Sequence, residues 1–258
     1  MRKHMWAVVV MALVIAFGLL VVVAVPRVLA GDNDREGPNV IDRDSVAYGR
    51  TYSEWSAAWE QWADSIPVAN HPLFDNGDCS VGQSGPVWFL GGKFCANNAT
   101  NCGYTGITRR CTVPAGKALY FPVLNSEDSA LEEKYFPTGA TSKLQIADLR
   151  SYVESGIDGA TDFSCEVDGA PIPHLKQRFR VQSSAFGFTL PADNLFKAIY
   201  PSPGSASFTA GRYFPAVDDG VYVMIAPLSP GHHVIHFGGS FPIYNFTQDI
   251  TYHLRVEK

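Results

Sequence analysis

Two adjacent carboxylates, Glu127 and Asp128, are the residues of this sequence whose type best suits acid–base chemistry. An apolar stretch that ends near Asn125 precedes them, so the sequence predicts that they follow a β-strand. Glycosidases use two carboxylates about 5–9.5 Å apart across a cleft. Calcium binding is disfavoured because the oxygen-ligand spacing D-x-D-x-D-G is absent. A solvated acidic loop explains the same residues, and the sequence favours that interpretation.

A glycine-rich segment at residues 82–86 (GQSGP) partly matches the serine nucleophile motif G-x-S-x-G. The fifth residue is Pro86, and the apolar run after it predicts a strand instead of a helix, so we reject a serine hydrolase. The segment can still form a polar loop that faces a ligand, although an ordinary turn into a buried strand is the favoured interpretation. The candidate ligand-binding residues are Gln83, Ser84, Trp88 and Asn125.

Histidines gather near the C-terminus, where His232 and His236 would share one face of a helix. The turn that precedes them predicts a strand instead, which separates these two residues by about 13 Å. If this strand pairs with residues 250–256 about position 243, His233 faces His253 across the pair. Two imidazoles do not complete a metal site, so exposed strand histidines are the favoured interpretation. No metal or other cofactor is expected.

The N-terminus has the composition of an export signal. Arg2 and Lys3 precede an apolar run over residues 5–25, and residues 28–30 (VLA) resemble a cleavage site. The run is long enough to span a bilayer, so a signal peptide over residues 1–30 and an uncleaved membrane anchor both remain open. Either one places the rest of the chain outside the cytoplasm, where it is secreted, periplasmic or anchored to the membrane. The N-terminal segment is its sole expected contact with a membrane.

Composition limits the partners of the exported part. The chain of 258 residues has a net charge of −5, and residues 1–30 hold three cations and no acid, so the remainder is more acidic still. An acidic chain without a basic run argues against nucleic acid and anionic lipid as ligands. The oligomeric state is left open.

Five cysteines in an exported chain predict disulfides. Cys95 and Cys102 bracket a polar loop, and Cys79 and Cys111 flank that loop from outside. The arrangement predicts nested bridges, Cys79–Cys111 and Cys95–Cys102. Cys165 lies in an alternating apolar stretch, which indicates a buried free thiol.

The pattern of elements predicts a mostly β protein with a single β-sandwich or jelly-roll-like domain over residues 48–258, after a flexible linker at 31–47. A capping box at Thr51 and Glu54 begins an amphipathic, Trp-rich helix that ends at Pro67 and closes one side of the sandwich. A second, short helix is expected over residues 142–155, ended by Gly156. Turns are expected at 114–116, 168–169, 218–220 and 229–231.

Several of these segments occur together in one family. They are the helix at 52–62 (YSEWSAAWEQW), the stretch 81–90 (VGQSGPVWFL), the turn 113–117 (VPAGK), and 227–239, which begins PLSPGH and ends FGG. Their combination resembles a family of exported microbial proteins without an established activity. The resemblance covers about residues 48–256 and implies one extracytoplasmic domain, and it carries over no catalytic residue.

These observations lead to one functional hypothesis and two alternatives. The leading hypothesis is an exported, non-catalytic binding protein whose partner is a glycan or an envelope component, because sugar sites stack rings on aromatic faces. The alternatives are a polysaccharide-acting hydrolase or lyase that uses acidic residues, and a structural or assembly protein of the cell surface. Burial of Trp88 and of the helix tryptophans would remove the candidates for ring stacking, whereas paired carboxylates in a cleft would favour the enzyme.

The nested bridges can be tested by intact mass. Because each bridge removes two hydrogens, protein expressed in the periplasm should weigh ~4 Da less than the fully reduced protein. An unshifted mass would refute both bridges.

Overall fold

The structure is a computed structural model that describes residues 38–96, 104–135, 145–200 and 208–258. Residues 35–258 form one compact unit, and its described part is mostly β, as the sequence predicts. The helices are α1 (Tyr52–Ser65), α2 (Ala130–Glu133), α3 (Ile146–Asp158), α4 (Leu175–Phe179) and α5 (Leu195–Ile199). The strands are β1 (Val87–Phe89), β2 (Ile107–Pro114), β3 (Ala118–Ser129), β4 (Thr161–Val167), β5 (Ala170–Pro171), β6 (Arg180–Gln182), β7 (Phe186–Leu190), β8 (Gly211–Ile225), β9 (Gly231–Phe241) and β10 (Phe246–Glu257).

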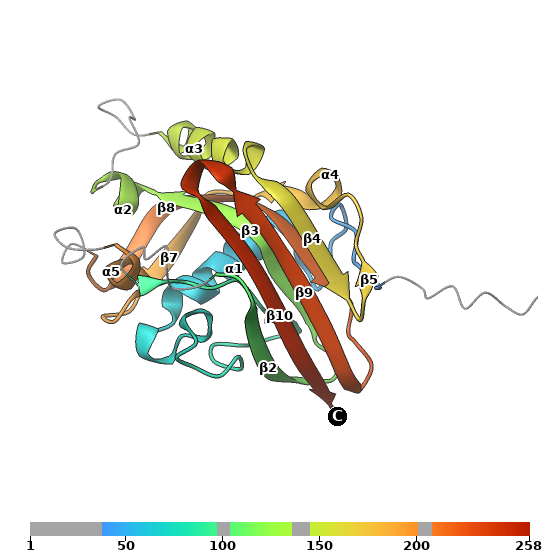
Figure 1. Cartoon of the computed structure of the whole chain (residues 1–258). Coiled ribbons are helices and arrows are strands. Elements are labelled where there is room, and N and C mark those ends of the chain that lie inside the picture. The colour runs from blue at the N-terminus through green and yellow to red at the C-terminus, as the bar shows by residue number, and fades with distance from the viewer. Residues whose placement is uncertain (1–37, 97–103, 136–144, 201–207) are drawn as a thin grey trace, which may run out of the picture. The chain divides into compact units, whose positions relative to one another are not determined.

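These strands form two mixed sheets that pack face to face (Figure 1). The first sheet has the order β1-β3-β8-β6, with β7 also paired to β8, and the second has the order β2-β10-β9-β4-β5. Phe121 on β3 meets Phe237 on β9 between the sheets, with ring centroids 4.8 Å apart. Helix α1 covers the other face of the first sheet, which confirms the predicted sandwich closed on one side by a helix.

Helix α1 forms as the sequence predicts. The Thr51 side chain accepts from the Glu54 amide, and the Glu54 carboxylate accepts from the Thr51 amide, which completes the capping box. Its three tryptophans are buried, and each indole N–H donates to a backbone carbonyl of a loop. The pairs are Trp55 with Ala47 at 2.8 Å, Trp59 with Leu90 at 2.7 Å and Trp62 with Val81 at 3.2 Å. These bonds fix the rotation of the helix over the sheet.

Three local predictions are wrong. Residues 218–220 lie inside β8 and do not form a turn, because Asp218 faces polar partners beneath α1. Glu127 and Asp128 lie inside β3 and not in a solvated loop after it, because the strand continues to Ser129. The turn at 114–116 forms as predicted and carries the chain from the second sheet to the first. Helix α3 continues past Gly156, which packs against Ser126: a Cβ there would lie 3.3 Å from the serine oxygen. The glycine permits close packing of α3 on β3 and does not end the helix.

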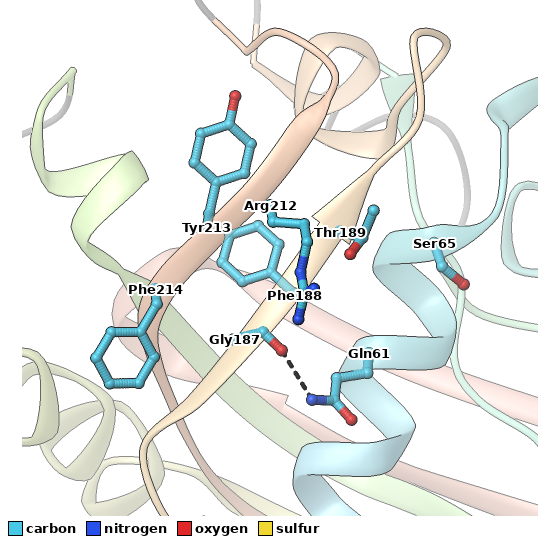
Figure 2. Close-up of a pocket in the computed structure, with 8 residues that line it drawn as sticks. All are labelled: Gln61, Ser65, Gly187, Phe188, Thr189, Arg212, Tyr213 and Phe214. Atoms are coloured by element: carbon cyan, nitrogen blue, oxygen red, sulfur yellow. Dashed lines mark hydrogen bonds between the residues drawn. The ribbon is translucent and has the colours of Figure 1, made fainter.

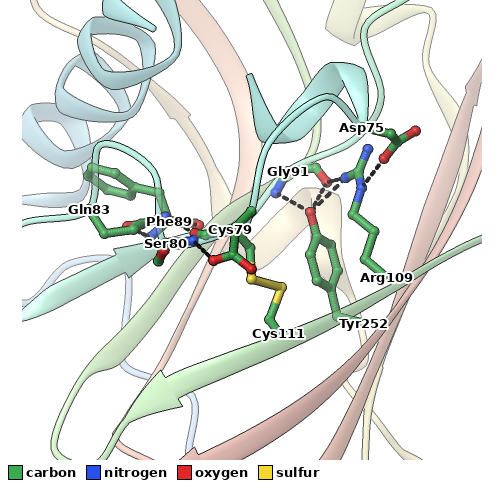
Figure 3. Close-up of a disulfide and its surroundings, with 10 residues drawn as sticks. Asp75, Cys79, Ser80, Gln83, Phe89, Gly91, Arg109, Cys111 and Tyr252 are labelled. Atoms are coloured by element: carbon green, nitrogen blue, oxygen red, sulfur yellow. Dashed lines mark hydrogen bonds and ion pairs between the residues drawn. A yellow bond between two sulfur atoms is a disulfide. The ribbon is translucent and has the colours of Figure 1, made fainter. Parts of the chain in front are cut away.

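A disulfide fastens the segment that follows α1 to the second sheet (Figure 3). Cys79–Cys111 forms as predicted, whereas Cys102 lies outside the described residues, so the Cys95–Cys102 bridge stays a prediction. Cys165 is a buried free thiol, as expected. Beside the bridge, the Arg109 guanidinium binds Asp75 at 2.7 Å and donates to the carbonyls of Gly91 and Gly92.

The N-terminal part of the chain is described only from residue 38 on. Residues 38–47, which belong to the predicted linker, run beside β8: the Ile41 amide donates to Met224, and the Ala226 amide donates to Asn39. The expected signal or anchor, residues 1–30, lies outside the described residues. Of the helices that are described, none combines the length and the apolar character needed to cross a bilayer.

We expect the double substitution Cys79→Ser, Cys111→Ser to lower the free energy of unfolding by about 3–4 kcal/mol, because the bridge closes a loop of 32 residues in the unfolded chain. Urea unfolding measures the change. Cys165→Ala is the matched control, since it removes a thiol without removing a cross-link. A double variant as stable as the control would contradict a stabilising bridge.

Candidate functional site

Six carboxyl groups gather around the end of the first sheet, and we call them the acid cluster. Helix α1 contributes two of them, one turn apart, and β3, α2 and β8 contribute the others. The members are Glu60, Asp64, Glu127, Asp128, Glu132 and Asp218. Five of them are at least nine-tenths buried, and Glu127 is the member that is partly exposed. Asp128 lies opposite Val217 on β8, so it points to the face that α3 covers and meets the others through Glu132.

The local structure explains why these residues meet. Glu127 on β3 lies directly opposite Asp218 on β8, and residues opposite each other in an antiparallel pair share a face of the sheet. Two residues earlier, Asn125 lies opposite Gly220, where a Cβ would come within 2.7 Å of the Asn125 side chain. The glycine therefore allows Asn125 to lie across β8. Glu60 and Asp64, four residues apart on α1, face the sheet from above.

Neutral donors hold the cluster in place. The Asn125 amide donates to Glu60 at 2.6 Å and to Asp218 at 3.2 Å. The Tyr200 hydroxyl donates to Glu132 at 2.5 Å, and the Ser129 hydroxyl donates to the other oxygen of Glu132 at 2.8 Å. Because these donors carry no charge, they orient the carboxyl groups without neutralising them.

Within the described residues, no member of the cluster forms an ion pair with a lysine, arginine or histidine. Four of its oxygens are enclosed and lack a hydrogen-bond partner, one each from Asp64, Glu127, Asp128 and Asp218. Unpaired buried carboxylates are costly, so protons must replace the missing partners. The described side chains also include no group of three His, Cys, Asp or Glu residues arranged to hold a metal ion.

Burial and mutual repulsion raise the pKa values of the cluster. Burial is the main cause throughout; Asp218 adds to it at Glu60, and Glu132 adds to it at Glu127 and Asp64. The pKa of Asp218 rises to about 7 and that of Asp128 to about 8. Two pairs of carboxyls, Glu60 with Asp218 and Glu127 with Glu132, lie within hydrogen-bonding reach of each other. Such a pair can bond only when one member is protonated.

The neighbouring Asp219 shows the opposite solution. Its side chain points to the other face of the first sheet, where the Arg180 guanidinium binds it with a shortest distance of 2.8 Å. Arg180 also pairs with Asp158 of α3, and Gln182 donates to Asp219. Two adjacent buried aspartates thus differ in that one has a cation and the other has none.

The structure brings together only part of the predicted site. Asn125, Glu127 and Asp128 lie in or beside the acid cluster. Gln83 lies elsewhere, because its amide bonds both the carbonyl and the N–H of Phe89, which is paired with Tyr120, five residues before Asn125 on β3. The remaining candidates differ in exposure: Ser84 is exposed, whereas Trp88 is buried, with 5% of its surface exposed. The predicted ligand-binding set is therefore divided between two regions of the fold.

The predicted pairing of His233 with His253 is wrong. The β9–β10 register places His233 opposite Leu254 and His253 opposite Val234, so the two histidines point to opposite faces of the second sheet. A shift of one residue is enough to cause this, since side chains alternate along a strand. Both ring nitrogens of His233 are engaged, one with Asp168 at 2.7 Å and the other with the Ser229 carbonyl at 2.9 Å.

Sequence reasoning missed Glu60, Asp64, Glu132 and Asp218. The two helix acids were hidden by the tryptophan stripe, which dominates the pattern of α1. Asp218 was assigned to a turn because an Asp-Asp-Gly sequence is typical of turns. A detectable signal was the i, i+4 spacing of Glu60 and Asp64 next to that apolar stripe, since carboxylates on the buried side of a helix require partners.

The pKa shifts predict how stability depends on pH. Because the folded state holds protons that the unfolded chain releases above about pH 4, the free energy of unfolding should fall as pH rises from about 4 to 8. Asp218→Asn should flatten this dependence and raise the melting temperature at pH 8 relative to the wild type. Thermal melts at pH 5 and pH 8 measure both effects, with the exposed Glu166→Gln as the control. A wild type equally stable at both values would contradict a protonated cluster.

Comparisons with known proteins identify no family for this chain. No family model matches it, and no curated protein does. Among solved structures, a match is the complex of PbICP-C with falcipain-2, which is 10% identical, covers 67% of this chain and 100% of that chain, and has a TM-score of 0.22. A likeness this weak supports no conclusion about fold or activity, so the function must be inferred from the site itself.

Proposed function

We propose that this protein is an exported acid–base enzyme that cleaves a polysaccharide outside the cytoplasm, with Glu127 as the carboxyl group that meets the substrate. The observation that carries the proposal is the Glu127–Glu132 pair, whose members lie within hydrogen-bonding reach inside a cluster that has no cation among the described residues. A protonated carboxyl beside an ionised one provides an acid and a base in the same place.

The pKa values in the cluster suit proton transfer. A catalytic acid or base works best when its pKa lies near the working pH. Asp218 and Asp128, at about 7 and about 8, lie in that range, whereas unperturbed carboxyls are ionised there. Burial and Glu132 raise the pKa of Glu127 as well, so this carboxyl holds a proton more readily than an unperturbed one.

Exposure favours Glu127 as the member that reaches the substrate. Asn125, Ser126 and Glu127 are partly exposed, whereas the other five carboxyls are buried. One oxygen of Glu127 is enclosed and lacks a hydrogen-bond partner, although the residue itself is not fully buried. The enclosed oxygen cannot meet a ligand, so we assign contact with the reacting hydroxyl or water to the exposed part of the Glu127 carboxyl group.

The tryptophans no longer support the simpler hypothesis of a ring-stacking binding protein. Trp55, Trp59, Trp62 and Trp88 are exposed by 7%, 2%, 6% and 5%, so none of them offers a face to a sugar. Non-catalytic binding of a glycan or envelope component remains the second candidate, and an open groove beside α1, described below, is the observation that favours it. A structural or assembly role has no comparable support.

Two features support export. The Cys79–Cys111 bridge fits an oxidising compartment, where disulfides persist. Residues 1–30 have the composition of a signal peptide or anchor. Both are consistent with a substrate outside the cytoplasm.

We expect protein recovered after export to be retained on at least one insoluble polysaccharide or cell-wall fraction and to release soluble sugar in the same tube. Glu127→Gln should lower the rate of release by about 100-fold or more, as removal of a general acid or base does, while retention persists. Glu166→Gln, an exposed acid of β4, is the control and should release sugar at the wild-type rate. Retention without release by the wild type would support the binding protein instead, and the absence of both signals would refute the glycan hypothesis.

A further inference from the structure

A groove of about 680 Å³ lies beside α1, where β7 and the first residues of β8 form its floor (Figure 2). We call it the β7–β8 groove. It lies apart from the residues that the sequence nominated for binding, and none of the acid cluster lines it. Its lining combines one cation, aromatic rings and short polar groups, and the members that matter here are Gln61, Gly187, Thr189, Arg212, Tyr213 and Phe214.

Phe214 is the most unusual residue of the groove. Its side chain is 65% exposed, whereas the aromatic rings of the neighbouring cluster, such as Phe188 and Phe208, are buried. Gly187 lies beside it on β7: a Cβ there would lie 3.0 Å from the Tyr213 carbonyl and 3.8 Å from the Phe214 ring. The absence of a side chain at Gly187 therefore leaves space next to the phenyl ring. An exposed ring with free space next to it can stack on a flat apolar surface of a ligand.

Arg212 supplies a charge on the same face. Arg212 lies opposite Thr189, which is two residues from Gly187 on β7, and the Cβ position of Gly187 lies beside Phe214, so Arg212 and Phe214 both line the groove. Arg212 is exposed and forms no ion pair with any acid in the described residues. A free guanidinium recognises a carboxylate through two parallel hydrogen bonds.

Polar groups with fixed positions complete the groove. Thr189 lies directly opposite Arg212 in the β7–β8 pair, so its side chain points to the same face. The Gln61 amide donates to the Gly187 carbonyl at 2.7 Å, which ties α1 to the floor of the groove. The Tyr213 hydroxyl donates to the Thr209 carbonyl at 2.8 Å, so β8 is held on its other side as well.

We infer that the β7–β8 groove binds an anionic polysaccharide, with Phe214 stacked on a sugar ring and Arg212 paired with the carboxylate of a uronate. The combination of one exposed ring, one free guanidinium and short hydroxyl and amide groups matches the surface of an acidic sugar, which has an apolar ring face, hydroxyls and one negative charge. The inference deepens the proposed function because it names the substrate class. It rests on the proposed function for cleavage but not for binding. The chain as a whole is acidic, so its net charge does not attract an anionic ligand. The attraction comes from Arg212, which is the cation among the residues that line the groove.

Calorimetric titration with hexagalacturonate at low salt tests the groove in the exported protein. Arg212→Gln should weaken binding at least 10-fold, as loss of a charge-assisted pair does, and Phe214→Ala should weaken it about 3–10-fold. Arg110→Gln is the matched control, because Arg110 is an exposed arginine on β2 of the other sheet. The affinity of this variant for hexagalacturonate should stay within twofold of that of the wild type. Far-ultraviolet circular dichroism and the melting temperature show whether each variant is folded.

Two competitor ligands define the chemical class. Cellohexaose, which has the rings without the charge, and hexaglutamate, which has the charge without the rings, should each bind at least 10-fold more weakly than hexagalacturonate. Equal binding of hexaglutamate would identify an acidic-peptide site and overturn the inference. The inference would also be overturned if Arg212→Gln bound hexagalacturonate as tightly as the wild type, or if the wild type did not bind it. Glu127→Gln should bind hexagalacturonate normally. Loss of cleavage with intact binding therefore concerns the acid cluster, and loss of binding concerns the groove.

Discussion

The burial of six carboxyl groups around the end of the first sheet is the constraint on which the rest of the structure depends. Removing an ionised carboxylate from water costs far more than a typical hydrogen bond returns, so such groups either pair with cations or remain protonated. Asp219 takes the first course through Arg180, and Asp218, its neighbour in sequence, takes the second. Because alternation along β8 sends the two side chains to opposite faces, one strand separates a stabilising ion pair from a group of carboxyls held by protons and neutral donors.

A site this unfavourable persists only if the surrounding structure prevents its relaxation. The three indole bonds of α1 serve that purpose, since they join the helix to the carbonyls of Ala47, Leu90 and Val81 in three separate segments of the chain. Rotation of α1 that would expose Glu60 or Asp64 to water would break these bonds and expose tryptophan surface. The disulfide and Arg109 hold the segment after α1 in turn against the second sheet. The stability of the aromatic core therefore compensates for the strain of the acid cluster, as is common at functional sites.

Much of the fold could be predicted because its strongest signals are local. The capping box and tryptophan stripe of α1, the hairpin turn at Asp168 and Gly169, and the alternation of β10 each follow from nearby residues. The errors arose where distant residues decide the outcome. Asp218 lies in a strand because Asn125, on the neighbouring strand, donates a hydrogen bond to it beneath α1. The register of β9 on β10 depends on the short helix at Pro242–Tyr244 and on Asn245, which adopts a left-handed conformation. A one-residue error in that connection reversed the faces of His233 and His253. The acid cluster itself is assembled from four elements, so only two neighbouring members were identified from the sequence.

The groove and the acid cluster share one wall, helix α1, so the two proposed sites are linked through the same element. Gln61 and Ser65 line the groove, while Glu60 and Asp64, the residues directly before them, belong to the cluster. Consecutive residues of a helix lie about 100° apart around its axis, so α1 presents one surface to the groove and an adjacent surface to the buried carboxyls. The Gln61 bond to Gly187 fixes the first surface, and the Asn125 bond to Glu60 fixes the second. Because both contacts are made by α1, a rotation of the helix that moved one surface would also move the other.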